Sequence, residues 1–500
     1  MLGTYSYVSL LLLLLALVYL VHKSRHMSKI CNDKCSSAMV PLPPGPLPWP
    51  VVGSLPEMML NKPAFRWIHL VMKEMDTDIA CFRLGGVNVV PITCPKIARE
   101  VLKKQDANFV SRPISFASSA ISSGYKDTVL SPFGDQWRKM CRVLTSEIVC
   151  PSCHKWQHDK RADEADNFTR YVYNLATGTS SRGRPDAKVD VRHVAQHYCG
   201  NVIRRVVFGR PDYLPWLLGF DLDGHEKMVK EANATVNRLH DMVINERWRQ
   251  WNGDEMPGEP QDLLDVLITL KDGHGNRLLT IEEVRAQCKD ITLAATDNPS
   301  NAVEWALAEM VENPELLAKA VEEMDRVVGR ERLVQESDIP QLNYIKACIR
   351  EAFRLHPVAP FNVPHVAIAD TTVAGYRVPK GSHVILSRIG LGRNTAVWDD
   401  PLCFRPERHM GNDVNVALTE NELRFISFST GRRGCVAATL GTAMSVMLFG
   451  RLLQGFTWSK PAGVSVIHLN ESKDDLFMAN PLVLHAEPRL PVHLYPPSFC

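Results

Sequence analysis

The stretch Phe428-Ser-Thr-Gly431-Arg-Arg433-Gly-Cys435-Val-Ala437 decides the fold class of this 500-residue chain. A cysteine thiolate that binds haem iron needs such a loop, because its glycines let the backbone approach the porphyrin and direct N–H groups toward the sulfur. Phe428 is suited to shield the sulfur from water, and Arg433 to pair with a haem propionate. Residues 437–453 predict a helix, whose N-terminus favours the thiolate of Cys435. We therefore expect Cys435 to be the axial iron ligand of a haem b group.

Two upstream segments support this interpretation. Glu351-Ala-Phe-Arg354 places an acid and a base three residues apart, on one face of a helix. Arg408, in Phe404-Arg-Pro-Glu-Arg408, can join them in a buried charge triad. The ordered set Glu-x-x-Arg, Pro-Glu-Arg and Phe-x-x-Gly-x-Arg-x-Cys resembles the cytochrome P450 superfamily over nearly the whole chain. The resemblance implies a mainly α fold with a small β portion, formed by a single large haem-thiolate domain behind an N-terminal membrane anchor.

The composition is that of a globular protein. Hydrophobic residues make up 45% of the chain and charged residues 22%, and the net charge of +2 gives no support for a nucleic-acid partner. Thirteen cysteines in a chain of this length do not make a disulfide scaffold. No Gly/Ser linker or repeat divides the sequence after residue 60, so we expect one large domain.

The first residues predict a membrane anchor. Residues 2–21 carry no charge, and about 20 apolar residues can span a bilayer. Basic residues follow at once, which places the following domain in the cytosol. We expect an anchor at 1–22, a basic flank and proline-rich hinge at 23–56, and the catalytic domain at 57–500. The resemblance implies that this anchor lies in the endoplasmic reticulum membrane.

Local patterns predict the main elements. Strands are expected at 79–84 and 87–92 around Gly85-Gly86, and a second pair, 371–378 with 383–386, around Pro379-Lys-Gly381. Thr280-Ile-Glu-Glu283 is a capping box that predicts a long helix toward Met310. Asn313-Pro314 predicts the start of the next helix, and His356-Pro357 the end of the helix that carries Glu351.

The long helix carries the second chemical signal, Ala294-Ala-Thr-Asp297-Asn298-Pro299-Ser300. Proline inside a helix removes a backbone hydrogen bond and opens the helix locally. Small residues beside it leave room over a haem for oxygen and substrate. The superfamily usually has an acid followed by threonine here, for proton delivery. Asp297 and Asn298 are therefore the catalytic candidates, and Asn298 in place of threonine puts the proton route in doubt.

Three segments narrow the resemblance. Residues 297–305, 356–365 and 428–438 are similar to those of the plant amino-acid N-hydroxylases, and residues 220–495 to the tyrosine N-monooxygenase group. These enzymes convert an amino acid to its aldoxime by two N-hydroxylations, followed by loss of carbon dioxide and water. The resemblance implies an aromatic L-amino acid as the substrate, tyrosine or phenylalanine. It also implies O2, electrons from NADPH–cytochrome P450 reductase, and a role in cyanogenic glucoside synthesis.

The resemblance also implies further haem contacts. The helix around Trp137 usually carries a basic residue four positions on, where this chain has Cys141, so Arg142 is the expected substitute. His365 is expected at a haem propionate. We expect a basic docking surface for the reductase beside the thiolate, formed by Arg138, Lys139, Arg142 and Arg432.

Candidates for the substrate pocket come from segments that line it in the superfamily. Arg112 is expected to hold the substrate carboxylate, and Asn298 and Ser300 to bond the polar end of the amino acid. The remaining lining candidates are Phe116, Phe361, Asn362, Val363 and Phe477.

One departure leaves three functions open. The family carries some tens of additional residues after a segment such as Phe208-Gly-Arg210, and they form part of the roof over the substrate. Here the chain runs directly into Tyr213-Leu-Pro-Trp216. The candidates are a reductase-dependent N-hydroxylase, a haem-thiolate enzyme that rearranges a peroxide without a redox partner, and an inactive haem-binding relic. Dependence on a reductant separates the first two, and a ferrous thiolate–CO spectrum without product indicates the third.

Overall fold

The computed structural model describes residues 40–178, 188–208, 225–253, 258–411 and 415–495. It forms two compact units, one up to Ser111 with Phe361–Leu391, the other comprising Arg112–Pro360 and the residues from Gly392 on. The predicted anchor at 1–22, the basic flank and the junction after Arg210 lie outside the described residues. Among the residues described, no helix is both long and apolar enough to cross a membrane.

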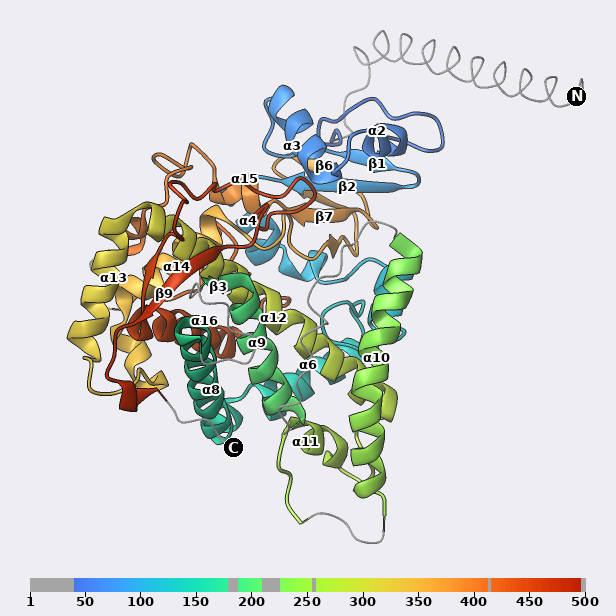
Figure 1. Ribbon diagram of the computed structural model, residues 1–500. Coiled ribbons are helices and arrows are strands. Elements are labelled where there is room, and N and C mark those ends of the chain that lie inside the picture. Colours follow the sequence, from blue (N-terminus) through green and yellow to red (C-terminus); the bar gives the residue numbers. More distant parts are fainter. Residues whose placement is uncertain (1–39, 179–187, 209–224, 254–257, 412–414, 496–500) are drawn as a thin grey trace, which may run out of the picture. The chain divides into compact units, whose positions relative to one another are not determined.

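The first unit is built on a four-stranded sheet with the order β1-β2-β7-β4. As the two glycines predict, β1 (Phe82–Leu84) and β2 (Val87–Ile92) form an antiparallel hairpin. β7 (His383–Leu386) runs parallel to β2 and antiparallel to β4 (His365–Val366). Figure 1 shows this pairing as blue β2 beside orange β7, two segments far apart in the sequence.

The predicted pairing of 371–378 with 383–386 is wrong. β5 (Thr371–Val373) instead pairs with β6 (Tyr376–Val378) in a separate hairpin. Its turn residues, Ala374 and Gly375, have φ values of 51° and 80°, as a two-residue hairpin turn requires. The chain then turns again at Gly381 and enters the larger sheet as β7.

Part of the predicted hinge is folded onto the first unit. The Cys81 N–H donates to the Pro44 carbonyl (2.8 Å), and the Arg377 N–H donates to the Pro41 carbonyl (2.7 Å). Gly45 allows this approach, since a Cβ there would lie 1.9 Å from the Cys81 carbonyl oxygen. The helices of this unit are α2 (Leu55–Leu60), α3 (Ala64–Glu74) and α4 (Pro95–Arg99), with α15 (Arg388–Gly392) at its boundary.

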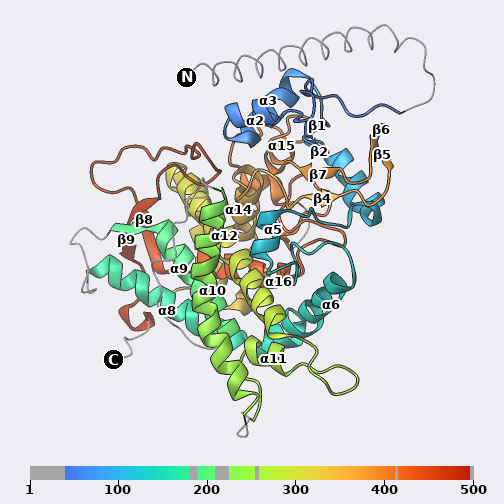
Figure 2. The same cartoon turned by 90° about the vertical axis from the view of Figure 1, so that its right-hand side faces the viewer.

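The second unit is mainly helical. Its long helices are α8 (His158–Thr177), α9 (Val191–Phe208), α10 (His225–Gln250), α12 (Ile281–Glu312), α13 (Pro314–Val327), α14 (Asn343–Leu355) and α16 (Ala438–Gly455). Shorter helices are α5 (Phe116–Ile121), α6 (Asp135–Val143), α7 (Pro151–Trp156) and α11 (Leu263–Thr269). A three-stranded sheet has the order β3 (Lys188–Asp190), β9 (Val483–Pro488), β8 (Phe456–Ser459). α12 packs along α9 and also contacts α14 and α16, as the two views agree (Figures 1 and 2).

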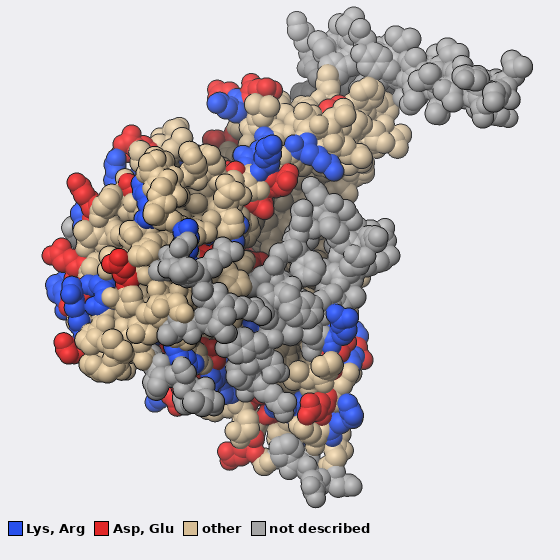
Figure 3. Space-filling model, in the orientation of Figure 1, with Lys and Arg blue, Asp and Glu red and all other residues tan. Residues whose placement is uncertain are grey.

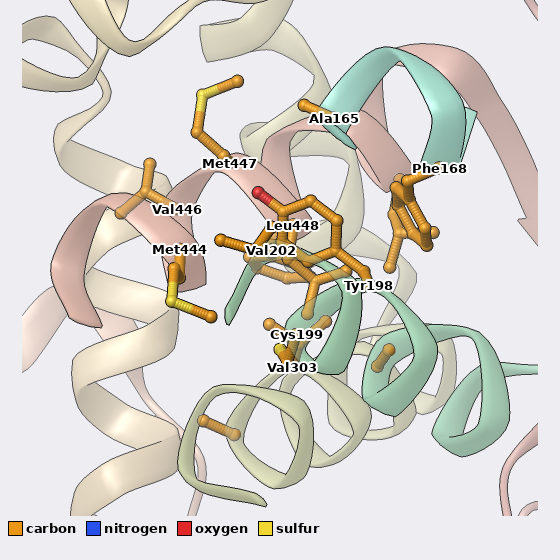
Figure 4. Packing of buried hydrophobic residues seen from close by; sticks show 14 of the residues in the cluster. Ala165, Phe168, Tyr198, Cys199, Val202, Val303, Met444, Val446, Met447 and Leu448 are labelled. Atoms are coloured by element: carbon orange, nitrogen blue, oxygen red, sulfur yellow. The ribbon is translucent and has the colours of Figure 1, made fainter. Parts of the chain in front are cut away.

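The core of the second unit lies where α8, α9, α12 and α16 meet. Figure 4 shows Tyr198 and Val202 of α9 between Phe168 of α8 and Leu448 of α16, with Val303 of α12 close by. All five are at most 3% exposed. Burial of such side chains contributes about 1.5–3 kcal/mol each and fixes α12 against α16.

The predicted helix ends hold closely. Thr280 and Glu283 form the capping box of α12, and α13 begins at Pro314. α14 ends at Leu355, just before His356-Pro357. α16 begins at Ala438, one residue later than predicted, with Ala437 as its N-cap. On the face in Figure 3, acidic and basic side chains are interspersed.

Candidate active site around Cys435

The loop before α16 presents the Cys435 thiol at the surface of the second unit. The Cys435 N–H donates to the Phe428 carbonyl (2.8 Å), and the Gly434 N–H to the Gly431 carbonyl (3.0 Å). Gly431 has a φ of 77°, a conformation that favours glycine. The backbone therefore holds the loop closed on itself and leaves Cys435 exposed three residues before the first turn of α16.

Phe428 is wedged under this loop. Its ring meets Phe353 of α14 edge-on, with centroids 5.9 Å apart. A Cβ at Gly441 would lie 2.9 Å from the Phe428 ring, so glycine in α16 makes room for it. The aromatic ring is thus fixed beside the loop, where it can exclude water from the sulfur.

Two arginines and a tryptophan gather on one side of the loop. The Arg433 guanidinium lies over the Trp137 ring, 4.3 Å from its centroid, and donates to the carbonyls of Thr128 (3.2 Å) and Ser131 (2.8 Å). Burial lowers the pKa of Arg433 to about 10. Burial and the charge of Arg433 lower the pKa of Arg112 to about 9, so the two cations are close neighbours.

These residues fit a thiolate-bound haem. They supply one exposed thiol, and two clustered arginines suited to two propionates. The middle of α12 adds an uncovered apolar stretch, in which Leu293 is 49% exposed although the helix is buried on both sides of it. The donor set and the apolar stretch both lie in the second unit.

The structure does not bring Arg142 to this group. Arg142 is exposed, five residues after Trp137 and on a different face of α6. Cys141 faces Arg433 instead: burial raises the pKa of the Cys141 thiol, and the charge of Arg433 opposes the rise. Among the other basic candidates, Lys139 is paired with Glu283 of α12 (2.8 Å). Arg138 is paired with Asp135 (2.6 Å), and Arg432 is exposed.

α12 remains continuous through Pro299. Ser300 is buried and donates to the Thr296 carbonyl (2.8 Å), while Asn298 is exposed and donates to the Ala294 carbonyl (3.1 Å). Asp297 is exposed as a residue, yet its carboxyl lies deep enough for desolvation to raise its pKa, and Gln196 donates to it at 3.5 Å. The side chains of Asn298 and Ser300, on both sides of Pro299, thus bond backbone carbonyls of α12. Asp297 is the titratable residue next to them.

The predicted triad forms a buried ion cluster. Glu351 and Arg354 are both 0% exposed and pair at 2.7 Å, and Arg408 joins at 3.0 Å. His409, which the sequence reasoning missed, also contacts Glu351 (2.7 Å). Although burial opposes the shift, hydrogen bonds from Arg354 and His409 lower the pKa of Glu351 to about 2. Arg354 also donates to the carbonyls of Gly392, Pro401 and Cys403, so the cluster fastens α14 to the segment before Arg408.

Of the five lining candidates, two lie in the second unit. Phe116 begins α5 and is 55% exposed. Phe477 lies beneath the Arg192 guanidinium, 5.8 Å from its ring centroid, and Arg192 is itself paired with Glu304 of α12 (2.8 Å). An ion pair between α9 and α12 therefore supports the position of Phe477.

The other candidates lie in the first unit. Asn362 is buried and bonds the edge of β7, accepting from the Leu386 N–H at 2.7 Å. Phe361 stacks on His69, with centroids 5.2 Å apart. His365 bonds the Phe109 carbonyl through Nδ1 (2.7 Å), which leaves Nε2 as the acceptor in neutral histidine. Val363 lies in the same loop and is partly buried.

Comparison with known proteins shows the family of this chain. The family model for cytochrome P450 matches residues 43–214 and 210–485, in two pieces that overlap at 210–214. A tyrosine N-monooxygenase of Sorghum bicolor is 67% identical over 542 aligned positions, covering 99% of this chain and 96% of the relative. The alignment is longer than the chain's 500 residues, so the relative has residues that this chain lacks.

Two further similarities extend this result. A phenylalanine N-monooxygenase of Prunus mume is 51% identical, covering 98% of this chain and 99% of the relative. A zebra fish cytochrome P450 structure with progesterone has a TM-score of 0.70 at 24% identity, over 86% of this chain and 100% of that one, which shows the shared fold. On the matched family model and these identities, the chain belongs to the cytochrome P450 family.

Proposed function

We propose that this cytochrome P450 N-hydroxylates an aromatic L-amino acid and releases its aldoxime, with tyrosine as the first candidate and phenylalanine as the second. The observation that carries the proposal is the 67% identity to a tyrosine N-monooxygenase over 99% of this chain. Relatives named for tryptophan and phenylalanine are 52% and 51% identical. None of these names describes peroxide rearrangement, so the monooxygenase is the favoured reading.

Haem bound through Cys435 supplies oxygen activation, with electrons delivered by a reductase. Cys435 would hold this group, and Phe428 would keep water from the sulfur. Arg433 and Arg112 offer two neighbouring cations to the propionates. Because it lies beside Arg433, Arg112 suits a propionate better than the substrate carboxylate that its sequence position suggested.

Proton supply falls to Asp297 in this proposal. The usual threonine is replaced by Asn298, whose amide is used in a bond to the Ala294 carbonyl. Asp297 has a pKa raised by desolvation, which favours its protonated form, and Gln196 is a hydrogen-bond neighbour on α9. Asp297 is thus the residue on this stretch of α12 that can hold and release a proton.

Pocket and cellular context complete the proposal. Phe116 and Phe477 of the second unit are proposed to contact the aromatic side chain, and Phe361 and Val363 of the first unit stay pocket candidates from the sequence. We further propose an anchor in the endoplasmic reticulum membrane through residues 1–22, with the catalytic part in the cytosol. NADPH–cytochrome P450 reductase is the proposed electron donor, and cyanogenic glucoside synthesis the proposed pathway.

The test is turnover on single amino acids. Membranes that contain the protein and the reductase receive tyrosine, phenylalanine, tryptophan, valine or isoleucine separately with NADPH, and the aldoxime is measured by mass spectrometry. We expect product from tyrosine above the others and none from Cys435→Ala, which should also lose the thiolate-type ferrous–CO spectrum. Aldoxime from an aliphatic amino acid alone would contradict the aromatic assignment. A normal spectrum with no aldoxime from any of them would favour an inactive relic, shortened after Arg210.

A further inference from the structure

Two carboxyl groups beside the arginine pair have no role in the site as described so far. Asp127 is 2% exposed and begins the loop 127–131, which precedes α6. Asp290 is partly buried on α12, seven residues before Asp297 and hence on the same helix face. Both carboxyls point at the backbone of this loop.

Each carboxyl accepts hydrogen bonds from loop N–H groups. Asp290 Oδ2 accepts from the N–H of Thr128 and the N–H of Val129, both at 3.2 Å. Asp127 Oδ2 accepts from the N–H of Leu130 at 3.1 Å. Three successive peptide groups of the loop are therefore held from the carboxyl side.

The two arginines hold the same peptide groups from the opposite end. Arg433 Nη1 donates to the Thr128 carbonyl (3.2 Å), and Arg112 Nε to the Val129 carbonyl (3.1 Å). The Thr128 carbonyl and the Val129 N–H belong to one peptide group, which thus lies between Arg433 and Asp290. The next peptide group, Val129 carbonyl with Leu130 N–H, lies in the same way between Arg112 and Asp127. A peptide group bonded at both ends is polarised, and each bond strengthens the other.

We propose that Asp290 and Asp127 are positioning residues for the haem-binding arginines. Asp290 holds Arg433, and Asp127 holds Arg112, each through one peptide group of the loop 127–131. The inference rests on haem binding through Cys435. It links α12 to an arginine of the cysteine loop through the backbone of the loop 127–131.

The charges of the cluster agree with this role. Burial and the neighbouring Asp127 raise the pKa of Asp290 to about 8, and burial raises the pKa of Asp127. A protonated carboxyl still accepts through its carbonyl oxygen. The acids can therefore hold the loop without cancelling both positive charges, which remain available to an anionic group.

The test measures haem loss from the purified holoprotein to an excess of apomyoglobin, which traps released haem. Asp290→Ala should accelerate haem loss about tenfold, because it removes both hydrogen bonds that the carboxyl accepts from the N–H groups of Thr128 and Val129. Asp290→Asn keeps an acceptor oxygen and should stay within about twofold of wild type. Thr128→Val is the matched control. The Thr128 hydroxyl bonds Gln287 of α12 (2.8 Å), and it does not bond the Thr128–Val129 peptide group to which Arg433 donates.

Double variants give the decisive readout. In an Arg433→Lys background the effect of Asp290→Ala should shrink below about twofold, while in an Arg112→Lys background it should stay about tenfold. Asp127→Ala should couple to Arg112 and also to Arg433, because Asp127 accepts from the Ser131 hydroxyl and the Ser131 carbonyl accepts from Arg433. Thr128→Val should show no preference. If Asp290→Ala does not fold, Asp290→Ser, whose hydroxyl is too short to reach the loop, replaces it.

Equal effects of Asp290→Ala in the Arg433→Lys and Arg112→Lys backgrounds would overturn the proposal. An Asp290→Asn variant that loses haem as fast as Asp290→Ala would overturn it too. A wild-type protein without a thiolate-type ferrous–CO spectrum would instead refute haem binding through Cys435. A normal wild-type spectrum with no pairwise coupling would refute only the positioning roles.

Discussion

Two clusters in the second unit combine arginines with buried acids, and they do so in different ways. In the Glu351 cluster the contacts are direct, with Arg354 and Arg408 at 2.7 and 3.0 Å from one carboxylate. In the cluster of the loop 127–131, peptide groups stand between each acid and its arginine. The first cluster holds α14 in place, whereas the second lies beside the thiolate loop.

The difference appears in the pKa values. Glu351 stays ionised, because direct hydrogen bonds from Arg354 and His409 outweigh its burial and lower its pKa to about 2. Asp290 has no hydrogen bond from an arginine or histidine of the described residues, and burial and the charge of Asp127 raise its pKa to about 8. Direct pairing therefore gives a permanently charged structural cluster, and pairing through the backbone gives one that can exchange a proton near neutral pH.

The largest effect is expected from Arg354→Ala. Removing one partner of a buried ion cluster leaves an uncompensated charge and typically costs about 3–5 kcal/mol. The variant should yield little haem-containing protein, and denaturant unfolding should show the loss directly. Arg330→Ala is the control, because Arg330 is exposed and solvent screens its pair with Asp325, which should contribute little to stability. Similar stabilities for the two variants would show that the Glu351 cluster behaves as surface charge.

Glu351→Gln should lower the unfolding free energy by a smaller amount, and the loss should depend on pH. A carboxyl with a lowered folded-state pKa contributes stability above its unfolded pKa of about 4.3, and this contribution is lost as the pH falls toward about 2. The difference in unfolding free energy between wild type and the variant should be about 3 kcal/mol at pH 7. It should narrow below about pH 4.5. A constant difference between pH 7 and pH 3 would contradict an ionised Glu351.

Asp290→Asn should show a pH dependence of opposite sign, and the change over the one pH unit that is measured should be smaller than the effect of Glu351→Gln. A carboxyl with a raised folded-state pKa binds more protons in the folded state, so wild-type stability should fall as the pH rises between about 4 and 8. Around pH 7 one proton gives a slope of at most about 1.4 kcal/mol per pH unit, and asparagine removes it. Unfolding at pH 6.5 and 7.5 measures this slope. Equal slopes in the two proteins would show that Asp290 is not protonated in the fold.

The two clusters also differ in how far the sequence predicts them. Glu351 and Arg354 are three residues apart on a helix, so their contact follows from local geometry, and Arg408 belongs to a recurring segment. His409 was missed, although it adjoins Arg408, because a histidine there is equally compatible with an exposed position. Asp127 and Asp290 act on backbone N–H groups, which every residue except proline carries, so no sequence pattern indicates their partners.

The same reasoning explains the other outcomes. The helix starts at Thr280 and Pro314 were predicted to the residue from a capping box and a proline, while the start of α16, which carries neither signal, was displaced by one. The hairpin at Gly85 was predicted from its two glycines, but the turn at Ala374-Gly375 was missed because alanine rarely adopts a positive φ. Arg142 was chosen for its charge, whereas its position on α6 follows from helix phase.

The smallest effect is expected from Arg142→Gln, which removes an exposed charge and not a member of a buried cluster. Arg142 is exposed, whereas Lys139 is held by Glu283 at 2.8 Å, so Arg142 should contribute more to docking of an acidic reductase. Exposed charges are screened beyond about 8 Å at physiological ionic strength, so they act mainly on association rate.

Arg142→Gln should lower the rate of reductase-dependent reduction about two- to threefold at low salt and flatten its salt dependence. Lys139→Gln should change both less, and Asp290→Asn should leave the salt dependence intact. Stopped-flow reduction at two salt concentrations measures all three variants, and an unchanged salt dependence in Arg142→Gln would place the docking surface elsewhere.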